Sequence, residues 1–280
     1  MSTLGSRALS LAALTVIELS PPEMVSAAAT AGYQYVGLRL IPATPEERSF
    51  PVIGNTPMVR EIKERLRDGN VGVLDVEVFR LKPETRVQAF LPAIETAADL
   101  GARHVLTTGQ DPDGSRLADR FAELCDLAAR YGLTADLEFM PWTEISTLEG
   151  ARRLLAAANR TNAGMLIDAL HFDRTDARLE DLAKVPDSWL HFIQLCDAPA
   201  ARPKTDEELI FEARNARLAP GKGQLDLVPL LRALPPGIPI SIEVPSPGTA
   251  QRVPAVERAQ AAILATRQLL DSLAASSAPA

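Results

Sequence analysis

The sequence predicts an α/β protein built as a single (β/α)8 TIM barrel. Eight short apolar runs alternate with longer amphipathic stretches through the 280 residues. Several runs are apolar without alternation, as parallel strands covered on both faces are, and no linker rich in Pro, Gly or Ser divides the chain. We therefore expect one domain over residues 1–280, with a frayed tail from about 275. The alternative is a doubly wound open sheet, which usually has fewer strands or a second domain.

The expected strands are the apolar runs themselves, each short enough to cross a barrel wall. In chain order they are Leu9–Val16, Tyr35–Leu40, Val71–Val78, His104–Thr107, Thr134–Phe139, Met165–Asp168, His191–Leu195 and Ile238–Val244. Ser20 and two prolines open the first helix and Gly32 closes it, which are ordinary start and stop signals. The further expected helices are Thr85–Leu100, Ser115–Tyr131, Thr147–Ala158, Leu225–Leu234 and Val256–Leu273. The longest irregular stretches, Ile41–Pro57 and Ala198–Gly223, each follow a strand, on the side where barrels build their sites.

Composition narrows the class of protein. The 29 Lys and Arg against 36 Asp and Glu give a net charge of -7 with no basic stripe, which argues against a nucleic-acid partner. No apolar run approaches the ~20 residues of a membrane span. Arg7 and the apolar run Ala8–Ile17 have the length of a signal-peptide core, but Glu18 ends the run, so a buried first strand is preferred. Two distant cysteines without a CxxC pattern favour a reducing cytoplasm.

Oxygen-bearing side chains end four consecutive expected strands, in the order Glu138, Asp168, Gln194 and Glu243. In a barrel these positions converge on the site. Converging carboxylates repel one another and are costly to bury unless something neutralises them. A divalent cation is the simplest neutraliser, and an all-oxygen set favours Mn2+ or Mg2+, although geometry also admits Co2+ or Zn2+. The alternative for each acidic residue is a helix cap or a surface ion pair.

His171 follows Asp168 by three residues, just past a strand end, so a substrate-facing role competes with a packed or capping one. His104 and His191 begin strands at the opposite end and are interpreted as structural. Arg217 precedes the tight turn Pro220–Gly223, and we expect it to clamp a carboxylate or hydroxyl-rich substrate, with a solvated surface arginine as the alternative. Other residues expected to line the pocket are Glu77, Arg80 and Trp142, with Arg39 a weaker candidate.

The chain resembles the xylose-isomerase-like TIM-barrel superfamily, the sugar phosphate isomerase/epimerase group, over nearly its whole length. The segments that carry the resemblance are Leu137-Glu-Phe-Met-Pro141, Ile167-Asp-Ala-Leu-His-Phe172, Phe192-Ile-Gln-Leu-Cys-Asp197, Leu218-Ala-Pro-Gly-Lys-Gly223 and Ser241-Ile-Glu-Val-Pro245. The resemblance implies one divalent metal ion held by Glu138, Asp168, Gln194 and Glu243. The superfamily's epimerases carry histidine where this chain has Gln194. Glutamine there resembles the bacterial 3-dehydroshikimate dehydratase branch, whose loop also has an arginine before Pro-Gly-x-Gly. The endonuclease IV relatives hold three zinc ions with many histidines, and three histidines in this chain argue against DNA repair.

Three functions stay open at this point. The first is a divalent-metal-dependent isomerase or epimerase of a sugar or polyol ketone that acts through an enediolate, for which the resemblance implies Glu138 and Glu243 as base and acid. The second is a metal-dependent lyase like 3-dehydroshikimate dehydratase or inosose dehydratase, with His171 carrying a proton. The third is a non-catalytic carbohydrate or keto-acid binding protein. General family membership places the isomerase slightly ahead, whereas Gln194 favours the lyase. Each hypothesis implies a small polyol or keto partner and a place in carbohydrate metabolism. Related barrels are often homo-oligomers, although no stripe in this sequence demands a partner copy.

Overall fold

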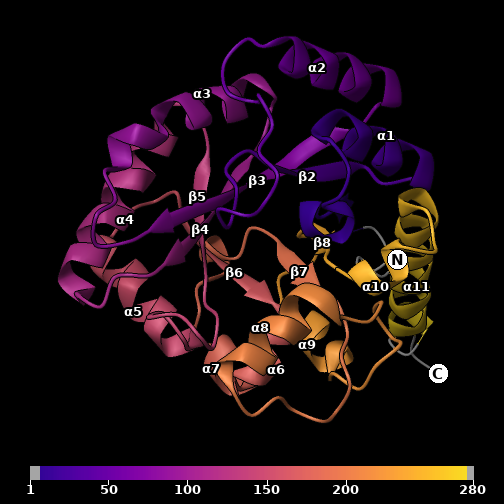
Figure 1. Cartoon of the computed structure of the whole chain (residues 1–280). Coiled ribbons are helices and arrows are strands. Elements are labelled where there is room, and N and C mark those ends of the chain that lie inside the picture. Colours follow the sequence, from indigo (N-terminus) through magenta and orange to yellow (C-terminus); the bar gives the residue numbers. More distant parts are fainter. Residues whose placement is uncertain (1–6, 276–280) are drawn as a thin grey trace.

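Eight parallel strands close into a barrel in their order along the chain, with β8 hydrogen-bonded to β1 (Figure 1). The computed structural model describes residues 7–275. The strands are β1 Leu9–Leu11, β2 Tyr35–Arg39, β3 Gly72–Leu81, β4 His104–Gly109, β5 Thr134–Glu138, β6 Ala163–Asp168, β7 Ile193–Leu195 and β8 Ile240–Ile242. The predicted (β/α)8 barrel is confirmed, and the open-sheet alternative is excluded by the pairing of β8 with β1.

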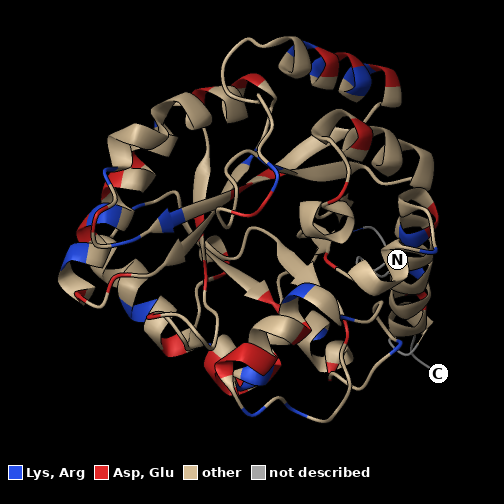
Figure 2. Cartoon of the chain, in the orientation of Figure 1, with Lys and Arg blue, Asp and Glu red and all other residues tan. Residues whose placement is uncertain are grey.

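Helices surround the strands on the outside of the barrel (Figure 1). The α-helices are α1 Pro21–Ala31, α2 Pro57–Gly69, α3 Leu91–Asp99, α4 Gly114–Ala129, α5 Leu148–Ala158, α6 Ala169–Arg174, α7 Leu179–Leu182, α8 Asp206–Asn215, α9 Leu227–Ala233, α10 Pro247–Ala250 and α11 Ala255–Ala275. Short 3-10 helices are η2 Ala13–Val16, η3 Val87–Phe90 and η4 Asp187–Trp189. Basic and acidic residues are interspersed along these helices (Figure 2). No helix within residues 7–275 is long and apolar enough to cross a membrane.

The first predicted strand is too long, because only its first part is extended. After β1 the chain turns into η2, and Thr15 fixes that turn against the neighbouring strand end. Its hydroxyl donates to the Ile242 carbonyl at 2.9 Å and accepts from the Val244 amide at 2.9 Å. An apolar run alone does not reveal such a turn, since helix and strand runs of this length look alike.

Helix α8 lies in a stretch expected to be irregular, and that expectation is wrong. Thr205 caps the helix by accepting from the Glu208 amide, and three acidic residues occupy its first turn, where the helix dipole favours them. Only Glu212 and Ala213 are buried, so the helix has no apolar stripe to predict it from. Helix α2 is likewise absent from the predicted set, although Thr56 and Asn70 carry its cap signals. The frayed tail predicted from about 275 lies outside the described residues beyond α11.

The apolar core of the described residues has three clusters. A large cluster fills the space between strands and helices, a small cluster contains Leu74, Leu106, Leu166 and Phe192, and a third contains Leu170, Cys196, Ala198 and Ala213. Leu106 and Leu166 stand two positions before Thr108 and Asp168, and therefore share the inward face of their strands. The small cluster thus fills the barrel interior and leaves the ends of the strands for polar side chains.

An irregularity in β3 brings two polar residues to the same side. In a regular strand, residues three apart face opposite ways. The pairing of β3 with β4 shifts register between Val76 and Phe79. Glu77 and Arg80 consequently both reach the cavity at the strand ends.

The long helix α11 offers a matched test of the packing. Leu270 is 4% exposed against the core, while Leu264 on the same helix is 55% exposed. We expect Leu270→Ala to lower the free energy of unfolding by about 2–4 kcal/mol, because it removes buried methyl groups and leaves a cavity. Leu264→Ala should change it by less than about 0.5 kcal/mol. Urea unfolding followed by circular dichroism measures both, and equal effects would contradict the placement of α11.

Candidate active site

A cavity of about 270 Å³ opens at the carboxyl ends of the strands. Every pocket residue predicted from the sequence lines it except Asp168, whose side chain lies fully buried just behind the cavity wall. The predicted residues on its lining are Glu77, Arg80, Glu138, Trp142, His171, Gln194, Arg217 and Glu243. The weaker candidate Arg39 lines it as well.

The strand register explains why the oxygen-bearing side chains meet. Glu138 and Asp168 are the last residues of β5 and β6, and Glu243 directly follows β8. Gln194 in β7 pairs with Asp168 on one side and with Ser241 on the other. Neighbouring parallel strands therefore present these four side chains at one level of the barrel.

Arg217 lies among these oxygens and bridges two of them. Its Nη1 is 2.5 Å from Asp168 Oδ2, and its Nη2 is 2.9 Å from Glu243 Oε2. Its Nε donates to the Ala213 carbonyl at 2.8 Å. The next residue, Leu218, exchanges two backbone hydrogen bonds of 2.8 Å with Asp197, which ties the loop to the end of β7. The guanidinium is buried and lines the cavity, so Arg217 is not the solvated surface arginine of the alternative.

Three carboxylates, Glu138, Asp168 and Glu243, face the single guanidinium of Arg217. Arg217 alone therefore does not balance their charge. Burial raises the pKa of Glu138 well above its usual value, and Asp168 and Glu243 raise it further. Burial also raises the pKa of Glu243, to about 7, against the opposing effect of Arg217. Burial opposes ionisation of Asp168 too, but Arg217 holds its pKa below the ordinary value. Two negative charges remain when all three carboxylates are ionised, which is the charge that a divalent cation neutralises.

Gln194 is the clearest sign that the cluster fits a cation. Its Nε2 donates to Glu243 Oε1 at 3.2 Å. Its carbonyl oxygen is buried and has no hydrogen-bond partner among the described residues. A buried, unpartnered carbonyl oxygen is costly. Together with the carboxylates it forms a hard, all-oxygen donor set of the kind that Mg2+ and Mn2+ prefer.

His171 stands beside Glu138 on the first turn of α6. Asp168 caps that helix, its Oδ1 accepting from the amides of Leu170 at 2.8 Å and His171 at 3.0 Å. The His171 Nε2 lies 3.7 Å from Glu138 Oε1, and the edge of Trp142 packs against the ring with centroids 5.0 Å apart. Burial lowers the pKa of His171 to about 4, so the imidazole is neutral near pH 7.

The remaining arginines of the cavity differ in their partners. Arg39 pairs with Glu77 at 3.0 Å and with Glu47 at 3.0 Å. Arg80 and Arg214 have no carboxylate partner among residues 7–275, and the buried Nε of Arg80 has no hydrogen-bond partner there. Burial lowers the pKa of Arg80, and the positive charges of Arg214 and Arg39 lower it further. Glu47 opposes this shift, so the cavity holds two neighbouring cations that feel nearby carboxylates but contact none of them directly within residues 7–275.

Two features of the cavity could not be found by sequence reasoning of this kind, namely Arg214 and the pairing of Arg39. Arg214 lies on α8, which shows no amphipathic pattern. The pairing of Arg39 with Glu47 joins a strand end to the stretch after it, and no motif marks such a contact. Arg214 lies in the last turn of α8, which ends at Asn215 before Arg217 is reached.

Comparison with known proteins settles the family. The xylose isomerase-like TIM barrel family matches residues 25–269. This chain belongs to that family. The family's relatives include enzymes, among them the 3-dehydroshikimate dehydratase of Pseudomonas aeruginosa, 30% identical over 116 residues that make up 41% of this chain and 18% of that protein. The inosose isomerase of Bacillus subtilis is 28% identical over 158 residues, 53% of this chain and 55% of that protein. This chain thus spans about half the length of the inosose isomerase and under a fifth of the length of the dehydratase.

Solved structures of other proteins share the fold. The IOLI protein, crystallised with a zinc atom, has a TM-score of 0.77 at 22% identity, and the alignment covers 95% of this chain and 99% of that one. The D-allulose 3-epimerase from Methylomonas sp., solved in complex with D-allulose, has a TM-score of 0.66 at 18% identity, with 94% and 97% covered. At these identities the likeness establishes the common barrel.

The ion pairs of Arg217 with Asp168 and Glu243 lead to a prediction for the stability of this protein. Arg217→Ala leaves Asp168 and Glu243 buried without their cation, so it should lower the free energy of unfolding of chelator-treated protein by about 3–5 kcal/mol. Addition of Mn2+ should recover part of the loss by binding the folded state. Differential scanning calorimetry measures both effects.

Arg214→Ala is the matched control, because it removes a neighbouring arginine that has no carboxylate partner among residues 7–275. It should leave the melting temperature nearly unchanged. Equal melting temperatures for wild type and Arg217→Ala would contradict the bridging role.

Proposed function

We propose that this chain is a divalent-metal-dependent lyase that removes a proton beside the carbonyl of a hydroxylated ring ketone bearing a carboxylate, and then expels a β-hydroxyl as water. The observation that carries the proposal is the pair Arg80 and Arg214, two half-buried arginines that line the cavity without a direct carboxylate contact among residues 7–275. Their guanidinium groups are free to bind an anion, so a substrate that supplies one fits this site. The identity shared with 3-dehydroshikimate dehydratase supports the same substrate class.

The metal ion of this proposal would be held by Glu138, Asp168, Gln194 and Glu243. When bound, it supplies Lewis acidity that polarises a carbonyl and stabilises the charge that develops on its oxygen. The unpartnered Gln194 oxygen and the two unbalanced negative charges support this assignment. The all-oxygen donor set favours Mn2+ or Mg2+.

The chain's own residues account for proton movement and substrate orientation. Neutral His171, held by the capped first turn of α6, accepts the proton from carbon at Nε2. The C–H electron pair forms the enolate, and its collapse breaks the bond to the β-hydroxyl. That leaving group takes the proton from the imidazolium and departs as water, so His171 returns to its neutral form. Arg80 and Arg214 orient the substrate by its carboxylate.

A second candidate function is the isomerase or epimerase of a neutral polyol ketone, for which Glu138 and Glu243 serve as base and acid. Its supporting observations are the raised pKa values of both carboxyls and the likeness to inosose isomerases. The two candidates share the first proton abstraction and differ in the fate of the resulting enolate. Arginines can donate hydrogen bonds to a neutral polyol, but an ionised carboxylate is the stronger partner for two neighbouring guanidinium groups, which is why we place the lyase first.

The substrate panel that separates the candidates contains ketoses, inososes and 3-dehydroshikimate, offered to protein reconstituted with Mn2+. The lyase gives a strong ultraviolet change on 3-dehydroshikimate as a conjugated product forms. An epimerase turns over a neutral ketone without that change. A binding protein turns over none of them, and either of the last two outcomes contradicts the proposal.

Arg80→Ala tests the anion contact. It should lower kcat/KM on a carboxylate substrate about a hundredfold, because a charge-assisted contact is lost, and should leave metal content unchanged. Arg80→Lys should recover little, since an ammonium does not reproduce the fork of donors. Steady-state kinetics and elemental analysis measure the two effects. Full activity of Arg80→Ala would show that the arginine does not touch the substrate.

Glu243→Gln and Glu138→Gln test the metal assignment. The wild-type protein should bind about one Mn2+ at this cavity, and each variant should bind that ion at least about tenfold more weakly, since a ligand loses its charge. Isothermal titration with Mn2+ measures the affinities. If both variants bind Mn2+ as tightly as wild type, these glutamates are not ligands.

A further inference from the structure

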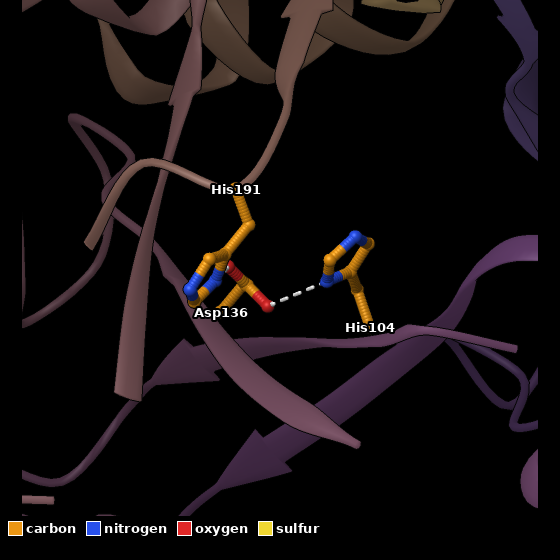
Figure 3. A group of neighbouring side chains, drawn as sticks. All are labelled: His104, Asp136 and His191. Carbon is orange, nitrogen blue, oxygen red and sulfur yellow. Dashed lines mark hydrogen bonds and ion pairs between the residues drawn. The ribbon is translucent and has the colours of Figure 1, made fainter. Parts of the chain in front are cut away.

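A second group of metal-ligating side chains lies at the other end of the barrel. His104 is the first residue of β4, Asp136 lies in β5, and His191 stands two residues before β7. Their side chains point toward one another across the amino-terminal end of the strands (Figure 3). None of them lines the cavity of the candidate active site.

The ligand atoms of this group are close enough to share one ion. His191 Nδ1 is 2.7 Å from Asp136 Oδ1, and His104 Nδ1 is 3.6 Å from Asp136 Oδ2. One atom from each residue lies within 4.8 Å of the others. Two ligands of a tetrahedral zinc ion, each about 2.0–2.1 Å from it, stand about 3.3 Å apart. Small adjustments of the side chains therefore suffice to place all three around one ion.

A candidate fourth ligand atom lies beside this group. Thr134 Oγ1 lies 2.7 Å from His104 Nδ1 and hydrogen-bonds to Asp136. Either this hydroxyl or a water molecule completes four ligands around an ion bound by the two imidazoles and the carboxylate.

The charge of Asp136 has no fixed cation beside it. The residue is fully buried, and within residues 7–275 no Lys or Arg forms an ion pair with it. Burial alone would raise its pKa, but its interactions with His104 and His191 hold the pKa below the usual range. The carboxylate is thus ionised, and the imidazoles are the groups that face it.

The side chains of Asp136 and His191 fit against β6 only because residue 164 is glycine. A Cβ at Gly164 would lie 2.1 Å from Asp136 Oδ1 and 2.4 Å from His191 Nδ1. Any other residue on this part of β6 would push these two side chains apart. His191 also keeps a route to solvent, because its side chain is 21% exposed.

We propose that His104, Asp136 and His191 form a second divalent metal site, which takes Zn2+ or a similar borderline ion. Two imidazoles and one carboxylate suit zinc, whereas the all-oxygen set at the opposite end suits Mg2+ or Mn2+. On binding, the ion displaces the proton shared by His191 and Asp136. It ties together the starts of β4, β5 and the segment before β7. The proposal is independent of the proposed function, since no active-site residue takes part.

The test uses the full chain, stripped with a chelator and then held in excess Mg2+ so that the hard-oxygen site is occupied. Isothermal titration with ZnCl2 should show about one Zn2+ bound per chain under these conditions. His191→Gln should weaken this binding at least about a hundredfold, because one of three protein ligands is lost. His171→Gln is the matched control, because it makes the same change at the opposite end and should leave the Zn2+ affinity unchanged.

A measurement on the wild-type protein keeps the test decisive if His191→Gln fails to fold. Co2+ substituted for Zn2+ in the presence of Mg2+ should give the intense visible absorption of a four-coordinate ion with nitrogen ligands. Absence of that absorption, or no binding of Zn2+ by the wild-type protein, would overturn the proposal. Equal Zn2+ affinity in wild type and folded His191→Gln would overturn it too. Loss of binding in His171→Gln alone would assign the ion to the active site and have the same effect.

Discussion

The buried guanidinium of Arg217 is the interaction on which the candidate site depends. It joins the end of β6 to the end of β8 through Asp168 and Glu243, and its Nε is held by the carbonyl of Ala213. Three carboxylates at one level of a barrel would otherwise repel one another in a dry environment. The loop that carries Arg217 is fixed in turn by the backbone pairing of Leu218 with Asp197. These contacts of Arg217 thus fix the position of its guanidinium and the orientation of Asp168 and Glu243 at the cavity.

The same barrel carries a group of possible metal ligands at each end of its strands. Four oxygen donors lie where the strands end, with His171 beside them, whereas two imidazoles and one carboxylate lie where the strands begin. The apolar cluster of Leu74, Leu106, Leu166 and Phe192 lies between them. A hard cation and a borderline cation would therefore find different sites in one chain, each matched to its donor atoms.

Much of the fold could be predicted from the sequence, because parallel strands buried on both faces appear in it as apolar runs. The number of these runs predicts the barrel. The strand-end rule likewise placed Glu138, Asp168, Gln194 and Glu243 around one point. The direction of the Arg217 side chain could not be predicted. The turn at Pro220 indicates a tight loop but does not indicate where a side chain before it points. Helix α8 and Arg214 escaped prediction because a helix stabilised by its cap and its first-turn charges carries no apolar periodicity. The register shift in β3, which brings Arg80 to the cavity, depends on pairing with β4 and leaves no mark in one strand's own residues.

The central claim is that this cavity completes its charge with an anionic substrate group. Isothermal titration of the Mn2+-reconstituted protein with an unreactive hydroxylated cyclohexene carboxylate, and with the methyl ester of the same compound, tests it most directly. The two ligands share their ring and hydroxyl groups and differ only in the charge offered to Arg80 and Arg214. The account predicts that the carboxylate binds at least about tenfold more tightly than the ester, because a charge-assisted contact is lost in the ester. Equal affinities, or tighter binding of the ester, would contradict it.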